Sequence, residues 1–368
     1  MIRVGIIGLG DTIGIARSHI KAYRLMEDVK VAALYDILPG RAQGYKDSLG
    51  LEDAFVCDSV EELLAQVDAV TICTPNASHI DLTVRALNAG KHVLCEKPFA
   101  PQAKDCEPAL KAAEDSGLVS MIGLCYRGIP AMRFLKHLVD SGELGDIYYV
   151  RESQGGNRIA NPQVKCEWRM QRELSGPGAI ADFGSHMLDM TDYILRSKCG
   201  RISKVQCMTG LFVQQRPSLE DGQPKGVDND DVGVFQLQMA NGALVSCAAS
   251  RIGADHTFEI FGSKGYAGFN GERPFELTRS YKEDNGGYKP GRETVPVPEF
   301  LYLQDPKTPV VPFEVNFYLQ NREFIDAING KVQTGTGFRR GVYVQRLIDA
   351  LQQSAEQGQT VDTSGLEE

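Results

Sequence analysis

The sequence predicts an α/β protein in which a doubly wound parallel sheet is followed by an α+β domain with a large, mostly antiparallel open sheet. Three observations predict this fold. Short apolar runs alternate with helical stretches in the first third of the chain, a glycine-rich turn follows the first run, and longer alternating runs fill the second half. The chain has 368 residues, which is room for two domains. We expect these to be residues 1–123 and 124–368, because the pattern changes there.

In the first domain the expected strands are short and almost entirely apolar, which is typical of a parallel sheet covered on both faces. Between them, Val60–Gln66 is expected to be helical, with Ser59 and Glu62 as a capping box. A second helix, Ile80–Ala89, is closed by Gly90. The expected strands are Ile2–Ile7, Val29–Tyr35, Ala54–Val56, Ala69–Cys73, His92–Cys95 and Val119–Ile122.

The second domain is expected to hold helices at about Pro130–Ser141 and from about Ala179, followed by alternating strands. Asn241-Gly242 between two of the strands predicts a hairpin. The Ser153–Arg172 stretch and the Gly- and Pro-rich Lys282–Pro312 segment are expected to be loops that widen a binding pocket. The remaining expected elements are the strands Ile202–Val213, Val232–Met239, Ala243–Ser250 and Thr257–Gly262 and the helices Val315–Asn329 and Gly341–Gln357.

Composition restricts the partners. A net charge of -9 disfavours nucleic acid and anionic lipid, and no apolar run approaches the length of a membrane span. The nine cysteines are scattered without a Cys-x-x-Cys pair, which is typical of reduced thiols in a cytoplasmic protein. Because one face of the second sheet lacks helices to cover it, we expect a homodimer or homotetramer.

The first expected strand runs into Gly8-Leu9-Gly10-Asp11-Thr12-Ile13, where glycines let the backbone approach a pyrophosphate at the N-terminus of the next helix. We therefore expect Gly8, Gly10, Thr12 and Ile13 to bind a dinucleotide. The usual spacing is not met, because the third small residue comes late, at Gly14 or Ala16. A glycine-rich turn without a ligand is the alternative.

Other strand ends support a dinucleotide site. Asp36 follows the second strand, where a carboxylate accepts hydrogen bonds from ribose hydroxyls and repels a 2′-phosphate. This favours NAD over NADP; the alternative is that Asp36 only forms a turn. Thr74-Pro75-Asn76 follows the fourth strand and is expected beside the nicotinamide ribose. The first domain is therefore interpreted as an NAD-binding Rossmann domain.

Two further segments carry catalytic chemistry. Lys97 follows the fifth strand at the same edge, and a cis Lys97–Pro98 bond would fix its direction; the alternative is a solvated loop lysine. If the Asp182–Asp189 segment is helical, Asp182, His186 and Asp189 share one face. A histidine oriented by a carboxylate is a general base, and a lysine stabilises an alkoxide.

The alternative for this second segment is a structural Asp–His pair. No metal is predicted, because the six histidines offer no second ligand nearby.

The chain resembles the Gfo/Idh/MocA family of sugar and inositol oxidoreductases over nearly its whole length. The resemblance is carried by the glycine-rich start, by Ala69–Asn76 with His79, by Gly90–Pro98 with its Glu-Lys-Pro, and by Gly176–His186. It implies that Lys97, Asp182 and His186 are catalytic, with His186 as the general base. It also implies cofactor contacts from His79, Glu96, Lys97 and Arg127, and substrate contacts from Lys97, Tyr126, Arg127, Trp168, Arg169, Asp182, His186 and Asp189.

The predicted function is hydride transfer between NAD and a secondary hydroxyl of a sugar, cyclitol or glycoside, such as inositol or the 3-position of a glycoside. Residues 124–368 would then form the substrate-binding and oligomerisation domain, in which Trp168 either stacks on a sugar or packs in the core. Two alternatives stay open. One is a regulatory protein on the same fold that senses a dinucleotide or sugar without turnover. The other is an enzyme that keeps NAD bound and recycles it with a second sugar.

Overall fold

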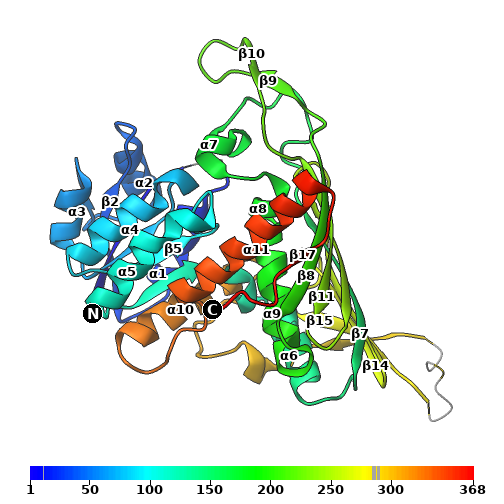
Figure 1. Ribbon diagram of the computed structural model, residues 1–368. Helices are drawn as coiled ribbons and strands as arrows, with labels where there is room; N and C mark the ends of the chain where they lie inside the picture. The colour runs from blue at the N-terminus through cyan, green and yellow to red at the C-terminus, as the bar shows by residue number, and fades with distance from the viewer. Residues whose placement is uncertain (11, 284–286, 288–290) are drawn as a thin grey trace. The chain divides into compact units, whose positions relative to one another are not determined.

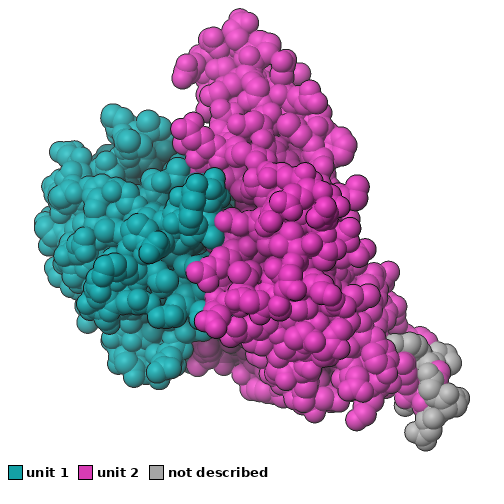
Figure 2. Space-filling view, in the orientation of Figure 1, with its two compact units in different colours: residues 1–128, 305–342, 368 teal, residues 129–304, 343–367 magenta. Residues whose placement is uncertain are grey.

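The computed structural model describes residues 1–10, 12–283, 287 and 291–368, and the chain divides into two compact units (Figures 1 and 2). Unit 1 comprises residues 1–128, 305–342 and 368, and unit 2 comprises residues 129–304 and 343–367. Each unit is built around its own sheet. Asp11, part of the expected glycine turn, lies outside the described residues.

In the described part of unit 1, six parallel strands have the order β3-β2-β1-β4-β5-β6, so the direction of winding reverses between β1 and β4. This is the predicted doubly wound sheet. The strands are β1 (Ile2–Ile7), β2 (Val29–Tyr35), β3 (Phe55–Val56), β4 (Ala69–Ile72), β5 (His92–Glu96) and β6 (Ser120–Gly123).

The helices of unit 1 include one contributed from far along the chain. Helix α10 packs against α1, and α4 packs against α5. Segment 305–342, which carries α10, thus joins the unit that the N-terminal residues form. The helices are α1 (Ile15–Arg24), α2 (Arg41–Leu49), α3 (Val60–Gln66), α4 (His79–Asn88), α5 (Glu107–Ser116) and α10 (Glu314–Ile328).

Local signals in unit 1 are confirmed with one correction. Ser59 Oγ accepts the Glu62 N–H at 3.1 Å and begins α3, as expected. The Glu62 carboxylate, however, accepts the N–H of Asp58 at 2.8 Å and not that of Ser59, so the capping box is displaced by one residue. Gly90 follows α4 with φ 74°, the left-handed conformation that glycine adopts without strain.

The described part of unit 2 forms a nine-stranded sheet of order β16-β15-β14-β13-β7-β12-β11-β8-β17, in which only β7 and β12 pair in parallel. The predicted large, mostly antiparallel sheet is confirmed. Its strands are β7 (Ile147–Gly155), β8 (Ile202–Gly210), β11 (Val232–Met239), β12 (Leu244–Ser250), β13 (His256–Gly262), β14 (Gly265–Asn270), β15 (Glu276–Tyr281), β16 (Glu293–Pro296) and β17 (Val361–Asp362).

Two expected loops hold strands. Ser153–Gly155 belongs to β7, near the middle of the sheet, where buried Glu152 and Gln154 break the apolar alternation that marks a strand. The second expected loop, Lys282–Pro312, contains the edge strand β16 (Glu293–Pro296). This strand was not predicted because the segment is rich in Gly and Pro, which are uncommon inside strands.

Helices cover one face of this sheet. The side chain of Ile180 in α8 reaches the backbone of β11 at Gly233, where an added Cβ would lie 2.2 Å from Ile180 Cγ2. The helices of unit 2 are α6 (Pro130–Asp140), α7 (Arg172–Ser175), α8 (Ala179–Asp182), α9 (Gly184–Cys199) and most of α11 (Phe338–Gln357), and a small hairpin pairs β9 (Gln215–Pro217) with β10 (Pro224–Gly226).

Glu152 lies buried between β7 and α9. Its Oε2 accepts the hydroxyl of Thr191 at 3.0 Å. Burial raises the pKa of Glu152 well above its ordinary value, the Thr191 hydrogen bond opposes that rise, and the charge of Asp189 adds to it. Burial in the fold therefore favours the neutral form of this carboxyl group.

Replacing Glu152 with glutamine should remove a pH-dependent loss of stability. Because the folded state binds this proton more tightly than the unfolded state, the wild-type free energy of unfolding falls as pH rises above about 4.3, with a slope of at most about 1.4 kcal/mol per pH unit. We expect Glu152→Gln to be more stable than the wild type at about pH 8 and closest to it at about pH 5. Urea unfolding followed by Trp168 fluorescence measures this, and an offset equal at both pH values would contradict it.

Candidate functional site

The carboxyl edge of the parallel sheet gathers the residues expected to bind the cofactor. Since all strands of this sheet are parallel, the segments that follow β1, β2, β4, β5 and β6 lie along one edge. The change of direction between β1 and β4 also lies at this edge, which is where doubly wound sheets bind ligands. The expected residues along this edge are Gly8, Gly10, Thr12, Ile13, Asp36, Thr74, Pro75, Asn76, His79, Glu96, Lys97, Tyr126 and Arg127.

The glycine turn is built by close approach and by left-handed backbone. Gly8 has φ 89°, and an added Cβ would lie 2.6 Å from Thr74 Cγ2 and 2.8 Å from Thr74 N. Gly14 has φ 73° and directly precedes α1, so Gly14 and not Ala16 is the third small residue of the turn. Nothing lies within 4 Å of a Cβ built at Gly10, which leaves room for a pyrophosphate at the N-terminus of α1.

Asp36 ties this turn to the end of β2. Its Oδ2 accepts the N–H of Leu9 at 2.7 Å, and its Oδ1 accepts the N–H of Leu38 at 2.9 Å. The guanidinium of Arg41 lies 3.3 Å from both carboxylate oxygens. Asp36 is thus part of the wall that shapes the turn, and a cation lies directly beside the position expected for the ribose.

His79 braces two loops of the same edge. Its Nε2 lies 2.9 Å from the carbonyl oxygen of Thr74, and its Nδ1 lies 3.0 Å from that of Pro98. Burial lowers the pKa of His79. The two carbonyl oxygens favour the protonated ring and oppose this lowering, but burial has the larger effect. Both ring nitrogens face backbone, so His79 acts on the site through the loops that it joins.

Glu96 is held by two side chains that sequence reasoning missed. Glu96 Oε1 lies 2.9 Å from Nε2 of His19 in α1, and Nδ1 of His19 lies 2.9 Å from Oδ1 of Asn321 in α10. His19 and Asn321 are both fully buried. His19 was detectable as a polar residue on the apolar face of a helix, but no local signal pairs it with Asn321, which comes some three hundred residues later.

The side-chain amide of Asn321 determines which ring nitrogen of His19 donates to it. Asn321 Nδ2 donates to the carbonyl oxygen of His19 at 3.3 Å, which leaves Asn321 Oδ1 to accept from Nδ1 of the ring. The other ring nitrogen, Nε2, faces Glu96 Oε1. The other oxygen, Glu96 Oε2, accepts the backbone N–H of Lys97 at 3.2 Å. Helix α1 and the lysine loop are thereby joined through one carboxyl group.

Lys97 precedes a cis peptide bond to Pro98, as the sequence suggested. Tyr126 and Arg127 lie in the short turn Cys125–Gly128 after β6. Arg127 donates to the carbonyl oxygen of Gly335 at 2.8 Å, so segment 305–342 also supports this end of the edge.

In unit 2 the catalytic candidates lie on two consecutive helices. Asp182 ends α8, α9 begins at Gly184, and Phe183 between them keeps helical torsions of φ -95° and ψ -36°. His186 and Asp189 are three residues apart in α9, so they share a face. Both are buried, with 5% and 0% of their surface exposed.

Trp168 and Arg169 lie together in a short 3-10 turn, Trp168–Met170, of unit 2. The guanidinium carbon of Arg169 is 4.2 Å from the centre of the Trp168 ring. The ring is half-buried, and Arg169 covers one of its faces with a cation.

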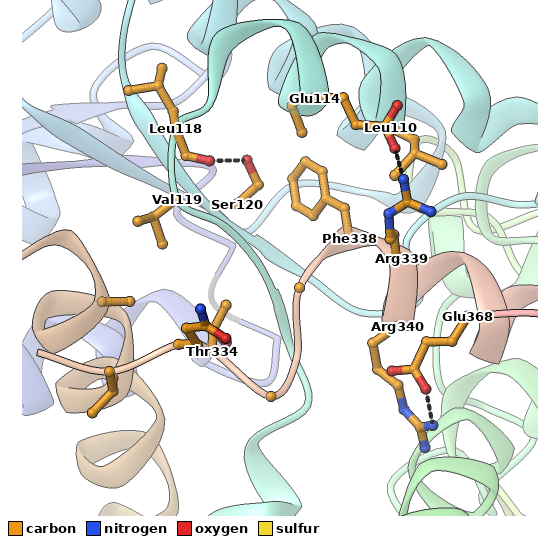
Figure 3. A pocket seen from close by; sticks show the side chains of 16 residues that line it. Leu110, Glu114, Leu118, Val119, Ser120, Thr334, Phe338, Arg339, Arg340 and Glu368 are labelled. Carbon is orange, nitrogen blue, oxygen red and sulfur yellow. Dashed lines mark hydrogen bonds and ion pairs between the residues drawn. The ribbon is translucent and has the colours of Figure 1, made fainter. Parts of the chain in front are cut away.

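A separate hollow of about 540 Å³ lies elsewhere in unit 1 (Figure 3). It is bordered by Val119 and Ser120 at the amino end of β6, on the sheet edge opposite to the glycine turn. Figure 3 shows the Arg339–Glu114 and Arg340–Glu368 pairs at its side. None of the expected site residues lines it, so it is not the candidate site.

Two family models match the chain. Residues 2–124 match that of an oxidoreductase family with an NAD-binding Rossmann fold, and residues 132–267 match that of the GFO/IDH/MocA C-terminal domain. These matches confirm the predicted resemblance, its fold and NAD as the cofactor of the N-terminal domain.

Individual relatives agree. Levoglucosan dehydrogenase of Pseudarthrobacter phenanthrenivorans is 29% identical over 316 residues, which are 80% of each chain. Glucose-6-phosphate 3-dehydrogenase of Bacillus subtilis is 30% identical over 252 residues, which are 68% of each. A solved complex of levoglucosan dehydrogenase with NADH and L-sorbose has a TM-score of 0.88, 26% identity and 98% coverage of both chains.

The Asp36–Arg41 pair predicts how cofactor choice can be changed. Asp36→Ala should weaken NAD binding and raise the NADP-to-NAD preference about tenfold or more, because Arg41 is then free to pair with a 2′-phosphate. The double variant Asp36→Ala/Arg41→Ala should lose that gain. Titration of both reduced cofactors by fluorescence measures this. An unchanged preference in Asp36→Ala would show that Asp36 does not determine ribose selectivity.

Proposed function

The chain belongs to the GFO/IDH/MocA oxidoreductase family, and we propose that it is an NAD-dependent dehydrogenase acting on a secondary hydroxyl of a sugar, cyclitol or glycoside. The main observation that supports the proposal is the position of Lys97, whose backbone is held by a hydrogen bond to Glu96. Lys97 follows β5 at the sheet edge that also holds Gly8 and Asp36, and its backbone is tied to buried Glu96. A cation at this position suits stabilisation of an alkoxide beside a bound dinucleotide.

The proposed roles follow from residue chemistry. NAD, when bound at the glycine turn, supplies the hydride acceptor. His186 takes the proton of the substrate hydroxyl, and Asp182 orients the imidazole. Lys97 stabilises the negative charge that develops on the hydroxyl oxygen. The reverse reduction uses the same groups, with His186 returning the proton.

Substrate binding is assigned to the remaining candidates. We propose that Trp168 stacks on a sugar face and that Tyr126, Arg127, Arg169 and Asp189 bind hydroxyl groups. The named relatives act on sugars, and one of them is a 3-dehydrogenase. The 3-hydroxyl of a pyranose glycoside is therefore the first hydroxyl to test, with inositols as the second class.

A screen of NADH formation against sugars, inositols and glycosides tests the proposal. The wild type should reduce NAD with at least one of these carbohydrates. Lys97→Met should lower kcat by about 10²–10³-fold while NADH binding is retained, because the lysine acts on the developing charge. Lys104→Met removes an exposed lysine from the turn that follows and should leave kcat unchanged.

Wild-type turnover in Lys97→Met would reject this lysine as catalytic. Binding of NADH and a carbohydrate without turnover in the wild type would favour the sensing alternative. NADH that stays with the protein through purification would favour recycling by a second sugar.

We also propose a cytoplasmic homo-oligomer that binds neither nucleic acid nor membrane. Eight of the nine cysteines are buried, and no disulfide is found in the part of the chain that the structure describes, which supports a reducing compartment. Among the described residues no helix has both the length and the hydropathy of a membrane span. The outward face of the unit 2 sheet exposes Met208 (77%) and Val234 (52%) on paired positions of β8 and β11. A second copy of the same face would cover them.

Placing a charge on this face should break the association. Val234→Lys should weaken the dimer at least about tenfold, or about 1.4 kcal/mol, because an ammonium would be desolvated between two sheets. Val332→Lys changes a similarly exposed valine of unit 1 and serves as the control. Light scattering across a concentration series measures the dissociation. A monomeric wild type, or equal effects of both substitutions, would contradict the proposal.

A further inference from the structure

Four consecutive side chains, Asp228 to Asp231, connect separate parts of unit 2. They lie between the β9–β10 hairpin, at the top of Figure 1, and strand β11. Asn229, Asp230 and Asp231 are buried. Buried polar side chains are retained only where their hydrogen-bonding groups are used. Asp228 and Asn229 bind segment 169–176, Asp230 binds the turn at Gly178, and Asp231 binds Phe212 and Val213, so the run acts as a junction.

Asp230 holds the turn that starts the catalytic helices. Its Oδ1 accepts the N–H of Gly178 at 2.7 Å, and its Oδ2 accepts that of Ile180 at 3.0 Å. The N–H of Ala179 donates to the backbone carbonyl of Asp230 at 3.0 Å. Three successive backbone donors, those of residues 178–180, are thus satisfied by one residue, and the last of them lies two positions before Asp182.

The backbones meet too closely for any side chain at Gly178. A Cβ built there would lie 1.8 Å from the carbonyl oxygen of Asp230. The φ of Gly178 is -81°, so glycine is required by proximity and not by a left-handed conformation. The turn at Gly178 therefore packs directly against the backbone of Asp230.

Asn229 holds the Trp168–Arg169 turn in the same way. Its Nδ2 donates to the carbonyl oxygen of Arg169 at 2.9 Å and to Ser175 Oγ at 2.8 Å. Its Oδ1 accepts from Arg251 at 2.7 Å, and Arg251 also donates to the Arg169 carbonyl oxygen at 2.7 Å. The candidate substrate-binding turn and the candidate catalytic helices are thus fixed by neighbouring residues.

Asp231 has a different target. Its Oδ2 accepts the N–H groups of Phe212 and Val213 at 2.8 and 2.9 Å. These residues lead into the β9–β10 hairpin, which carries none of the candidate site residues. Asp231 therefore provides a matched comparison: a neighbouring buried carboxylate that binds two backbone donors outside the site.

We propose that Asp230 is a positioning residue for hydride transfer, and that it sets the direction of Asp182 and His186 through the backbone of Gly178–Ile180. The proposal rests on the proposed function of those two residues. Catalytic groups must be held within about 0.5 Å of their working geometry, and a displacement of about 1 Å costs about 10²-fold in rate. Three hydrogen bonds to one buried residue supply that restraint.

The test compares Asp230→Asn with Asp231→Asn. In Asp230→Asn, an amide NH2 replaces one of the two carboxylate oxygens that accept the N–H groups of Gly178 and Ile180. Because two donors then face each other, we expect the turn to shift. We expect kcat to fall about 10–100-fold with the NADH dissociation constant unchanged, and the pH profile of kcat to shift because the surroundings of the His186 base change. Asp231→Asn should leave kcat within about threefold and the pH profile unmoved. Gly178→Ala, which displaces the same contact from the other side, should reproduce the Asp230→Asn result.

A readout without turnover separates this proposal from the proposed function. The amides of residues 178–180 should exchange hydrogen about tenfold faster or more in Asp230→Asn, but not in Asp231→Asn. If the wild type oxidises no carbohydrate, the proposed function fails while the exchange result still tests the restraint. Wild-type kcat in Asp230→Asn and Gly178→Ala, or an equal loss in Asp231→Asn, would overturn the positioning role.

Discussion

The contact on which the unit 1 site depends is the buried Glu96 carboxyl group. One oxygen meets His19 in the helix that follows the glycine turn, and the other accepts the backbone N–H of Lys97. Gly123 makes room for this group, since a Cβ there would lie 2.6 Å from Glu96 Oε1. The pyrophosphate end and the lysine of the proposed site are therefore coupled by a short, desolvated network, in which hydrogen bonds are strong and an unpaired group is costly.

In unit 2, buried polar side chains likewise hold the segments that carry the candidate residues. Buried polar side chains bind the backbone of the segments that carry Asp182, His186, Trp168 and Arg169. These side chains, Asn229 and Asp230, directly precede strand β11 of the sheet. In both units a side chain at a strand end binds backbone groups elsewhere. Reactive groups on loops and helix ends gain the precision that catalysis requires from such supports.

Sequence patterns predicted what depends on local periodicity and failed where long-range contacts decide. Val29–Tyr35 and Val232–Met239 were predicted with their observed bounds, because their apolar runs and alternation reflect the burial of each strand. Strand β7 was missed because Glu152 and Gln154 face the core. Asp36 and Lys97 were recognisable from their places after strands. Asn321 behind His19 depends on a contact between residues 302 positions apart, which no spacing reveals. Arg41 lies only five positions after Asp36, but nothing in that spacing marks it as the partner of the carboxylate.

The proposed function assigns Lys97 and His186 to the hydroxyl that is oxidised. The most direct measurement is an experimental structure with NADH and a carbohydrate substrate bound. We expect the reacting carbon about 3–3.5 Å from nicotinamide C4, with Lys97 Nζ and the His186 ring each within about 3.2 Å of its hydroxyl oxygen. A carbohydrate bound out of reach of either group, or a dinucleotide away from Gly8, would contradict it.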